Sequence, residues 1–338
     1  MQIFMRAAAG LALTCLLASM ASAQTLKAVQ DRGRLVCGVS EGLPGFSARD
    51  DKGQWSGLDI DFCRALAAAI FDDDSKVDFV PLSAEDRFSA LRSKKIDLLS
   101  RNSTWTMGRE TEFGLMFAAV NYYDGQGFMV RRAQKIDSAL ELAEKTICTK
   151  SGTTSELNLA DYFRNNRLSH KVLTLETADE ALKTYEDGRC AALTSDVSQL
   201  YAQRSKLATP RDHIILPDII SKEPLGPVVR QDDVRWFTIV KWTQFAMVNA
   251  DELGVSRENI SEAMKSEKPS IRRLLGKEGN FGQQLGLTND WAAQIVRLVG
   301  NYGEVFERNV GTGSKLGIPR GINSLWDRGG IQYAPPIR

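Results

Sequence analysis

The chain has 338 residues, with 43 Lys or Arg against 42 Asp or Glu, so its formal net charge is only +1. This balance gives no overall positive field for nucleic acid or an anionic membrane surface, and we expect no nucleic-acid partner. The length exceeds that of one compact core and predicts two lobes.

The N-terminus is typical of an export signal. Met1 to Arg6 carries one positive charge, Ala7 to Ala18 is almost wholly apolar, and Ala21-Ser22-Ala23 precedes Gln24. The apolar run is shorter than the ~20 residues that a membrane helix needs. We therefore expect residues 1–23 to be a signal peptide cleaved after Ala23, and the mature protein to be exported.

Four cysteines remain after this segment: Cys37, Cys63, Cys148 and Cys190. An even number in an exported chain favours disulfides, and two cysteines fall in each half of the core region. We predict the pairs Cys37–Cys63 and Cys148–Cys190.

Metal and nucleophilic chemistry are disfavoured. His170 and His213 are the only histidines, they stand far apart in the sequence, and no cysteine pair has CxxC spacing. The sequence therefore predicts no metal site, no catalytic triad and no cofactor.

The first half of the mature chain alternates strands and helices. Apolar runs predict strands at 35–39, 77–80 and 96–99, and apolar residues at helical spacing predict helices at 58–71 and 84–92. This β-α-β-α-β order makes parallel strands, and their carboxyl ends share the sheet edge where open α/β sheets bind ligands.

The second half repeats the pattern. Strands are predicted at 146–148, 172–175 and 191–193, and helices at 156–163 and 178–185. The fold class is therefore α/β, with two βαβ lobes. Towards the C-terminus we expect a helix at 236–248, added helices at 256–275 and a final helix at 291–306. We assign no function to the extension at 256–290.

Polar side chains follow the strands in both halves. Strand 96–99 leads into Ser100 to Arg109, which includes hydroxyls, an amide and two guanidiniums, and a guanidinium matches a carboxylate bidentately. In the second half, Gly152 lets the backbone approach closely, Thr153 to Ser155 open a helix whose free amide groups attract an anion, and Asp196 offers a carboxylate to a cation. Each feature alone is more simply a turn or helix cap, but together they predict a receptor for a zwitterion.

Seven segments carry a resemblance to a known family. They are Gly57-Leu58-Asp59-Ile60-Asp61, Ser100 to Arg109, Tyr122 to Gly127, Ser151-Gly152-Thr153-Thr154, Tyr185 to Arg189, Lys222 to Gly226 and Tyr333-Ala334-Pro335-Pro336. On these segments the chain resembles the polar amino-acid-binding proteins of ABC transporters, solute-binding protein family 3, from about residue 34 to residue 303. The general L-amino-acid-binding branch is the most similar.

The resemblance implies a type II periplasmic-binding-protein fold, in which two lobes joined by two hinge strands close on the ligand. Lobe 1 would comprise residues 24–129 and 227–338, and lobe 2 residues 130–226. The hinge strands would lie at 127–130 and 226–229.

The resemblance also implies roles for individual residues. Arg109 looks like the residue that pairs with the ligand α-carboxylate, helped by backbone amides at Thr104 and Thr154, with Thr153 at the same helix start. Asp196 looks like the residue that holds the α-ammonium, with Asn102 and Thr104 as further acceptors.

Two positions depart from the family pattern. Ser40 stands where several relatives carry an aspartate that meets a cationic side chain, which argues against a strict lysine or arginine receptor. Arg101 stands where many relatives carry serine; it either receives an acidic or amide ligand side chain or ties the lobes through a salt bridge. Phe46 and Trp105 are expected to form aromatic walls of the cleft, with ordinary packing as an equal alternative.

The resemblance implies a monomeric periplasmic protein that binds L-amino acids broadly, without catalysis, and delivers them to an inner-membrane ABC permease. An enzyme on the same fold, similar to cyclohexadienyl dehydratase, is the alternative, and it would need a carboxylic acid in the cleft. Glu41 is the nearest candidate for that acid. A sensor input domain is a third, less favoured possibility.

Overall fold

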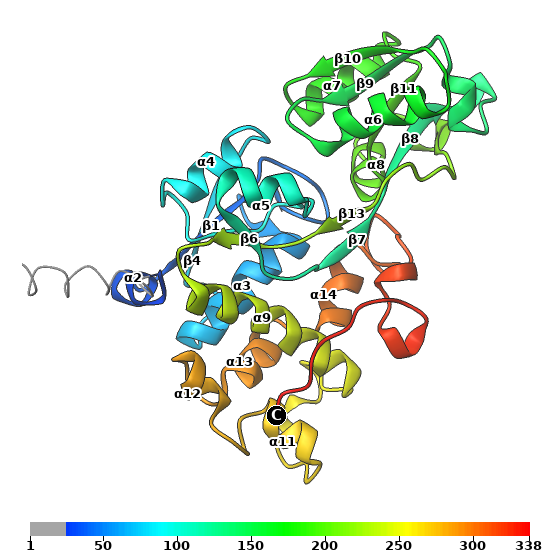
Figure 1. Cartoon of the computed structure of the whole chain (residues 1–338). Coiled ribbons are helices and arrows are strands. Elements are labelled where there is room, and N and C mark those ends of the chain that lie inside the picture. The colour runs from blue at the N-terminus through cyan, green and yellow to red at the C-terminus, as the bar shows by residue number, and fades with distance from the viewer. Residues whose placement is uncertain (1–24) are drawn as a thin grey trace, which may run out of the picture.

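The computed structural model describes residues 25–338 and contains two lobes, each built on a five-stranded sheet (Figure 1). The first sheet has the order β4-β1-β5-β14-β6. β1 pairs in parallel with both β4 and β5, as expected from the β-α-β-α-β pattern, whereas β14 pairs antiparallel with β5 and β6. The bounds are β1 (Leu35–Ser40), β4 (Val77–Leu82), β5 (Leu98–Leu99), β6 (Leu115–Phe117) and β14 (Val228–Arg230), with connecting helices α3 (Leu58–Phe71) and α4 (Asp86–Arg92).

The second sheet has the order β10-β9-β11-β8-β12. β9 pairs in parallel with β10 and β11, and β8 pairs antiparallel with β11 and β12. This confirms the α/β fold class and the repeated pattern. The bounds are β8 (Gln126–Arg131), β9 (Thr146–Lys150), β10 (Lys171–Leu175), β11 (Ala192–Asp196) and β12 (His213–Ile215), with helices α6 (Thr154–Asn165), α7 (Ala178–Glu186) and α8 (Val197–Arg204).

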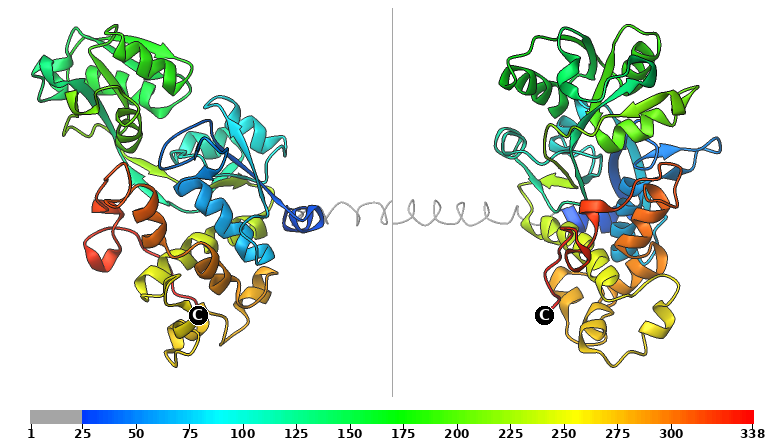
Figure 2. Two further views of the ribbon diagram at one scale, coloured as in Figure 1. Left: turned by 180° about the vertical axis from the view of Figure 1, so that it is seen from behind. Right: turned by 90° about the vertical axis from the view of Figure 1, so that its right-hand side faces the viewer.

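A two-stranded ribbon joins the lobes. It consists of β7 (Tyr122–Asp124) and β13 (Glu223–Leu225), which pair antiparallel, and it crosses between the two sheets in Figure 1 and in both views of Figure 2. The expected hinge positions were therefore wrong. Residues 127–130 lie inside β8, which pairs throughout with the second sheet, and residues 226–229 lead into β14 of the first. We propose that lobe 2 begins after Asp124, several residues before the expected boundary at 129.

The remaining elements surround the first lobe. The predicted final helix is in fact two helices, because Gly300 has φ 106° and Asn301 caps the second helix by accepting a hydrogen bond from the Glu304 amide. The helices are α2 (Thr25–Arg32), α5 (Met107–Phe113), α9 (Val234–Glu252), α10 (Ile260–Ala263), α11 (Pro269–Leu274), α12 (Phe281–Leu285), α13 (Trp291–Leu298) and α14 (Tyr302–Asn309), and a short hairpin contains β2 (Ala48–Arg49) and β3 (Trp55–Ser56). From residue 25 onward, no helix has the length and apolar character needed to cross a membrane.

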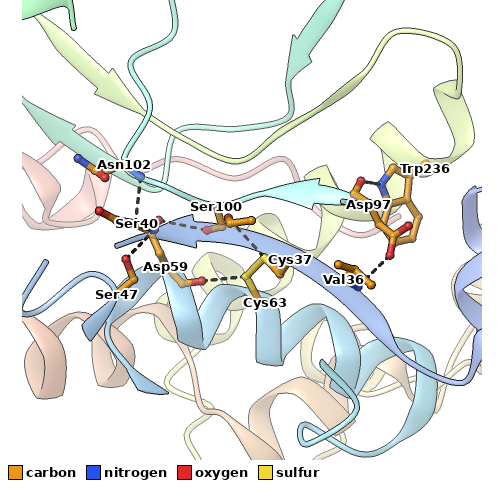
Figure 3. The surroundings of a disulfide bond; sticks show 11 residues. Val36, Cys37, Ser40, Ser47, Asp59, Cys63, Asp97, Ser100, Asn102 and Trp236 are labelled. Carbon is orange, nitrogen blue, oxygen red and sulfur yellow. Dashed lines mark hydrogen bonds between the residues drawn. A yellow bond between two sulfur atoms is a disulfide. The ribbon is translucent and has the colours of Figure 1, made fainter. Parts of the chain in front are cut away.

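Each lobe is cross-linked internally. Both predicted disulfides are present: Cys37–Cys63 joins β1 to α3, and Cys148–Cys190 joins β9 to the segment before β11. Figure 3 shows the first of them between β1 and α3, next to Asp59 and below Ser100, which follows β5. The disulfide therefore holds a strand and a helix that both contribute to the predicted ligand-binding edge.

The C-terminal segment returns to the ribbon. Asn323, which is buried, forms two hydrogen bonds with the backbone of Tyr123 in β7. The Tyr302 hydroxyl of α14 donates to the carbonyl oxygen of Asn121, just before β7. The residues that follow the second lobe therefore support the first connecting strand.

Candidate ligand-binding site

A cavity of about 230 Å³ is lined by residues of both lobes. The loops after β1 and β5 and the helices α4 and α5 contribute from the first lobe, and the first turns of α6, α7 and α8 contribute from the second. Eight of the ten predicted ligand-binding residues line it: Ser40, Arg101, Asn102, Thr104, Arg109, Thr153, Thr154 and Asp196.

The two predicted aromatic walls lie elsewhere. Phe46 is 1% exposed, and its ring packs edge-on against Tyr122 in the core of the first lobe, with centroids 5.4 Å apart. Trp105 stacks on Phe117 with centroids 5.8 Å apart and lines a separate groove. Successive residues of an extended chain point to opposite sides, so Trp105 faces away from the cavity that Thr104 lines. The structure therefore corrects both expectations in favour of ordinary packing.

Arg109 is placed by the start of α5. The Thr106 hydroxyl caps this helix by accepting a hydrogen bond from the Arg109 amide, and the Arg109 guanidinium donates to the Thr104 carbonyl oxygen at 2.7 Å. The guanidinium also lies 5.3 Å from the centre of the Phe88 ring. Burial lowers the pKa of Arg109, and the charges of Glu223 and Asp196 oppose this effect. The side chain remains a cation in a largely dry site.

Asp196 ends β11 and stands at the N-cap of α8, but its side chain makes no capping hydrogen bond. Its carboxylate accepts one from Gln199 Nε2 at 2.7 Å, and the residue is 3% exposed. Burial, followed by the charges of Asp124 and Glu223, raises the pKa of Asp196 well above its usual range. An acidic group in this setting favours a cationic partner.

Glu223 links the two lobes at the ribbon. Its buried carboxylate accepts hydrogen bonds from the Thr104 hydroxyl of the first lobe and from the Thr154 hydroxyl of the second, the latter at 2.9 Å. Asn158 Nδ2 and Ser221 Oγ donate to its other oxygen, both at 2.7 Å. The threonine hydroxyls are therefore already engaged, which leaves backbone groups at these positions for a ligand. Glu223 belongs to the Lys222 to Gly226 motif, but no role was predicted for it.

The loop after β5 is supported from α3 (Figure 3). Asp59 accepts hydrogen bonds from the Ser100 hydroxyl at 3.1 Å and from the backbone N–H of Asn102 at 3.0 Å. Burial raises the pKa of Asp59 to about 7. Asn102 has φ 36°, a left-handed conformation that asparagine tolerates well. Its Oδ1 is buried without a hydrogen-bond partner, and the residue lines the cavity.

Other lining residues received no binding role from the sequence. Glu41 was considered only as a possible acid, and Lys150 only as part of a polar loop. Arg87 is a residue of α4, and the apolar spacing of that helix gave no sign of a binding function. The remainder are Gly42, Leu43, Thr177, Ala178, Asp179 and Gln199, whereas Ser155 was expected as part of the anion-attracting start of α6. Between residues 25 and 338, no group of three or more His, Cys, Asp or Glu side chains is placed to hold a metal ion.

Known proteins share this arrangement. The sequence model described as bacterial extracellular solute-binding proteins, family 3, matches residues 35–273. The general L-amino acid-binding periplasmic protein AapJ of Rhizobium johnstonii is 54% identical over 334 residues, which are 98% of each chain. The glutamate/glutamine/aspartate/asparagine-binding protein BztA of Rhodobacter capsulatus is 48% identical, with 97% of each chain covered.

A solved structure extends the comparison to three dimensions. An ABC transporter periplasmic binding protein from Brucella ovis, with glutathione bound, is 52% identical and superposes with a TM-score of 0.92. The match covers 93% of the present chain and 99% of the other. The similarity therefore includes both lobes and the ribbon between them.

Proposed function

The chain belongs to family 3 of the bacterial extracellular solute-binding proteins, and from this premise we propose that it captures L-amino acids in the cavity between its lobes. The names of AapJ and BztA, which match along nearly their whole lengths, support amino acids as the ligands. The observation that carries the proposal is that one cavity holds the guanidinium of Arg109 and the carboxylate of Asp196, neither of which forms an ion pair within residues 25–338.

In this proposal Arg109 binds the α-carboxylate of the ligand. Among residues 25–338 its guanidinium forms no ion pair, and the first turn of α6 adds backbone amides of Thr154 and Ser155 that point towards an anion. A charge-assisted hydrogen bond in a site closed to water is stronger than the same contact in bulk solvent.

Asp196 binds the α-ammonium group, with the free Oδ1 of Asn102 as a further acceptor. Both contacts recognise groups that every L-amino acid carries, which supports broad specificity. Ser40 lines the cavity at the place where a cation-selective site would need a carboxylate, so a strict receptor for lysine or arginine is disfavoured.

We further propose that the protein works in the periplasm as a monomer, with residues 1–23 as its signal peptide, and delivers its ligand to an inner-membrane ABC permease. AapJ is named a periplasmic protein, and the Brucella ovis protein is named for an ABC transporter, which supports this placement. The cleavage site after Ala23 lies outside the residues that the structure describes.

We propose that the protein has no catalytic activity. Glu41, the candidate acid of a dehydratase-like enzyme, lines the cavity but is exposed to solvent, without the enclosed apolar surroundings in which catalytic carboxylic acids commonly lie. Incubation with a cyclohexadienyl substrate, followed by chromatography, tests this point. Product formation that Glu41→Gln abolishes would overturn it.

Titration calorimetry of the mature protein against the common L-amino acids tests the binding function. We expect micromolar dissociation constants, about −8 kcal/mol, for several ligands of different side-chain type. D-enantiomers are the matched control, because they cannot present both α-groups and the side chain in the same arrangement. If no L-amino acid binds, the proposal fails.

A further inference from the structure

The groove that Trp105 lines is a second cavity, separate from the one between the lobes. Thr104 lines the amino-acid cavity and the next residue, Trp105, lines the groove, and the two cavities share no lining residue. The groove has a volume of about 330 Å³ and lies between the segment that includes β6 and β7, helix α9 and the C-terminal segment. A cavity of this volume can hold a small molecule.

Aromatic side chains form much of the groove. They are Trp105, Phe117, Tyr123, Phe237, Phe245 and Tyr333. Two of them are open to solvent, since Trp105 is 39% exposed and Tyr333 is 60% exposed. Large apolar side chains that gather on an exposed surface mark a site of interaction. An apolar cavity of about 150 Å³ is enough to bind benzene, so the groove can receive an aromatic ring.

Two polar side chains of α9 line the same groove. Lys241 and Gln244 are three positions apart and therefore lie on one face of this helix. Gln244 is 2% exposed, and its Nε2 is buried without a hydrogen-bond partner. Lys241 Nζ lies 4.8 Å from the centre of the Phe237 ring, and across residues 25–338 it forms no ion pair. Both nitrogens are donors, so the two side chains suit an anion.

The charge of the groove agrees with this. Of the residues in the described part of the chain that line it, Lys241 is the only charged one, and none is acidic. A buried donor without a partner costs free energy, which a bound acceptor recovers. A carboxylate can accept from Gln244 and neutralise Lys241 at once, whereas a purely apolar occupant would leave the Gln244 amide without a partner.

The C-terminal segment supplies one wall of the groove through Gln332 and Tyr333. Gln332 Nε2 donates to the Tyr302 hydroxyl at 3.1 Å, and the Tyr333 ring packs edge-on against Trp326 with centroids 5.8 Å apart. Both residues lie outside the range 35–273 that the family model matches. The groove therefore depends on a segment that the family pattern does not include.

We propose that this groove is a second ligand site, which binds a small aromatic carboxylate. The ring packs among the aromatic side chains, and the carboxylate accepts hydrogen bonds from Lys241 and Gln244. Because the groove offers no carboxylate to an α-ammonium group, it favours aromatic acids without an amino group over amino acids. The site acts separately from the amino-acid cavity.

Phenylacetate and phenylacetamide test the proposal, because they share one shape and differ in charge. The chain has six tryptophans, and Trp105→Phe identifies the indole N–H signal of Trp105 in a nitrogen-15 correlation spectrum. In the mature protein we expect phenylacetate to shift this signal with a dissociation constant of about 1 mM or tighter. Phenylacetamide should bind about tenfold more weakly, since it lacks the charge-assisted contact. Arg109→Ala should respond as wild type does, which separates the groove from the amino-acid cavity.

Two variants of α9 assign the contacts. Lys241→Gln should bring the affinities for phenylacetate and phenylacetamide close together. Lys95→Gln, which removes an exposed lysine of the same lobe outside the groove, is the matched control and should keep the wild-type ratio. Gln244→Leu should weaken phenylacetate binding without lowering the thermal unfolding temperature, because it removes a buried donor that has no partner in the protein.

Three results would overturn the proposal. The first is a Trp105 signal that phenylacetate does not move. The second is equal binding of phenylacetate and phenylacetamide by the wild type. The third is self-association in sedimentation that Trp105→Ala abolishes, because it would assign the groove to a second copy of the chain.

Discussion

Asn323 and Tyr123 are 200 residues apart in the sequence, yet the Asn323 side chain accepts a hydrogen bond from the Tyr123 amide at 2.7 Å and donates one to the Tyr123 carbonyl oxygen at 2.9 Å. One amide side chain thus satisfies both backbone groups of a residue in the connecting strand β7. The geometry of the joint between the lobes consequently depends on a segment close to the C-terminus.

Asn323→Ala should lower the free energy of unfolding by about 1–3 kcal/mol, because it leaves two backbone groups of Tyr123 without partners. Urea unfolding followed by circular dichroism measures this. Asn323→Asp is the matched comparison: it keeps the acceptor for the Tyr123 amide but turns a buried carboxylate oxygen towards the Tyr123 carbonyl oxygen, so its loss of stability should be at least as large. Equal stability of Asn323→Ala and wild type would show that the contact is dispensable.

Arg109→Ala should weaken binding of every L-amino acid by about a hundredfold or more, since it removes the charged partner of a group that all of them share. Calorimetry with one acidic, one amide and one apolar ligand checks this. Arg109→Lys keeps the positive charge but not the planar guanidinium, so its affinity should lie between those of the wild type and Arg109→Ala. Retained affinity in Arg109→Ala would refute the assignment of the α-carboxylate.

Acidification should weaken binding of neutral amino acids. Burial and the charges of Asp124 and Glu223 raise the pKa of Asp196, and burial raises that of Asp124 to about 6, so the empty site takes up protons as the pH falls. An ammonium ligand needs an ionised carboxylate, so binding releases a proton and affinity drops by up to about tenfold per pH unit below the pKa.

Calorimetry between about pH 8 and about pH 5, in buffers of different ionisation heat, measures the number of protons released. Asp196→Asn should bind weakly at every pH and release fewer protons. A wild-type affinity that stayed constant over this range would contradict the proposed contact with the ammonium group.

Asp59 should make the folded state less stable as the pH rises. Its pKa is raised from 3.8 to about 7 by burial, so the folded state holds the proton more tightly than the unfolded state does. The resulting stabilisation is full below the unfolded value and is lost as the pH rises through the folded value. Urea unfolding of wild type and Asp59→Asn, compared from about pH 4 to about pH 7, should show a shallower decline in the variant. Parallel declines would mean that Asp59 does not titrate in this range.

Local signals in the sequence predicted much of the fold. The helix at 58–71 was placed to the residue because its apolar spacing, its early carboxylates and the preceding Gly57 agree. The disulfides followed from cysteine count and position. The hinge was misplaced because β7 and β13 are three residues each, too short for a periodicity, and they pair with each other across a long stretch of intervening chain.

The site residues that lie at or after strand ends were predicted from the sequence. Those that reach the cavity through contacts between distant segments were missed. Asp196 ends β11 and Arg109 comes after β5, and the parallel order brings the residues at the strand ends of each sheet to one edge of that sheet. Arg87 lies within a helix and meets the cavity only because the opposite lobe supplies Gly152. The direction of the Trp105 side chain depends on the bridge between Thr104 and Leu225, and no local sequence pattern predicts this pairing.

The pairing of β7 with β13 also constrains how the lobes can move. Two strands hydrogen-bonded side by side cannot bend independently, so we expect the lobes to swing about one axis. Thr104 and Thr154 contact Glu223 of the ribbon itself, whereas Glu85 and Ser151, which meet at 3.3 Å, join the lobes through segments outside the ribbon. Contacts of the second kind should therefore be the first to break when the lobes open.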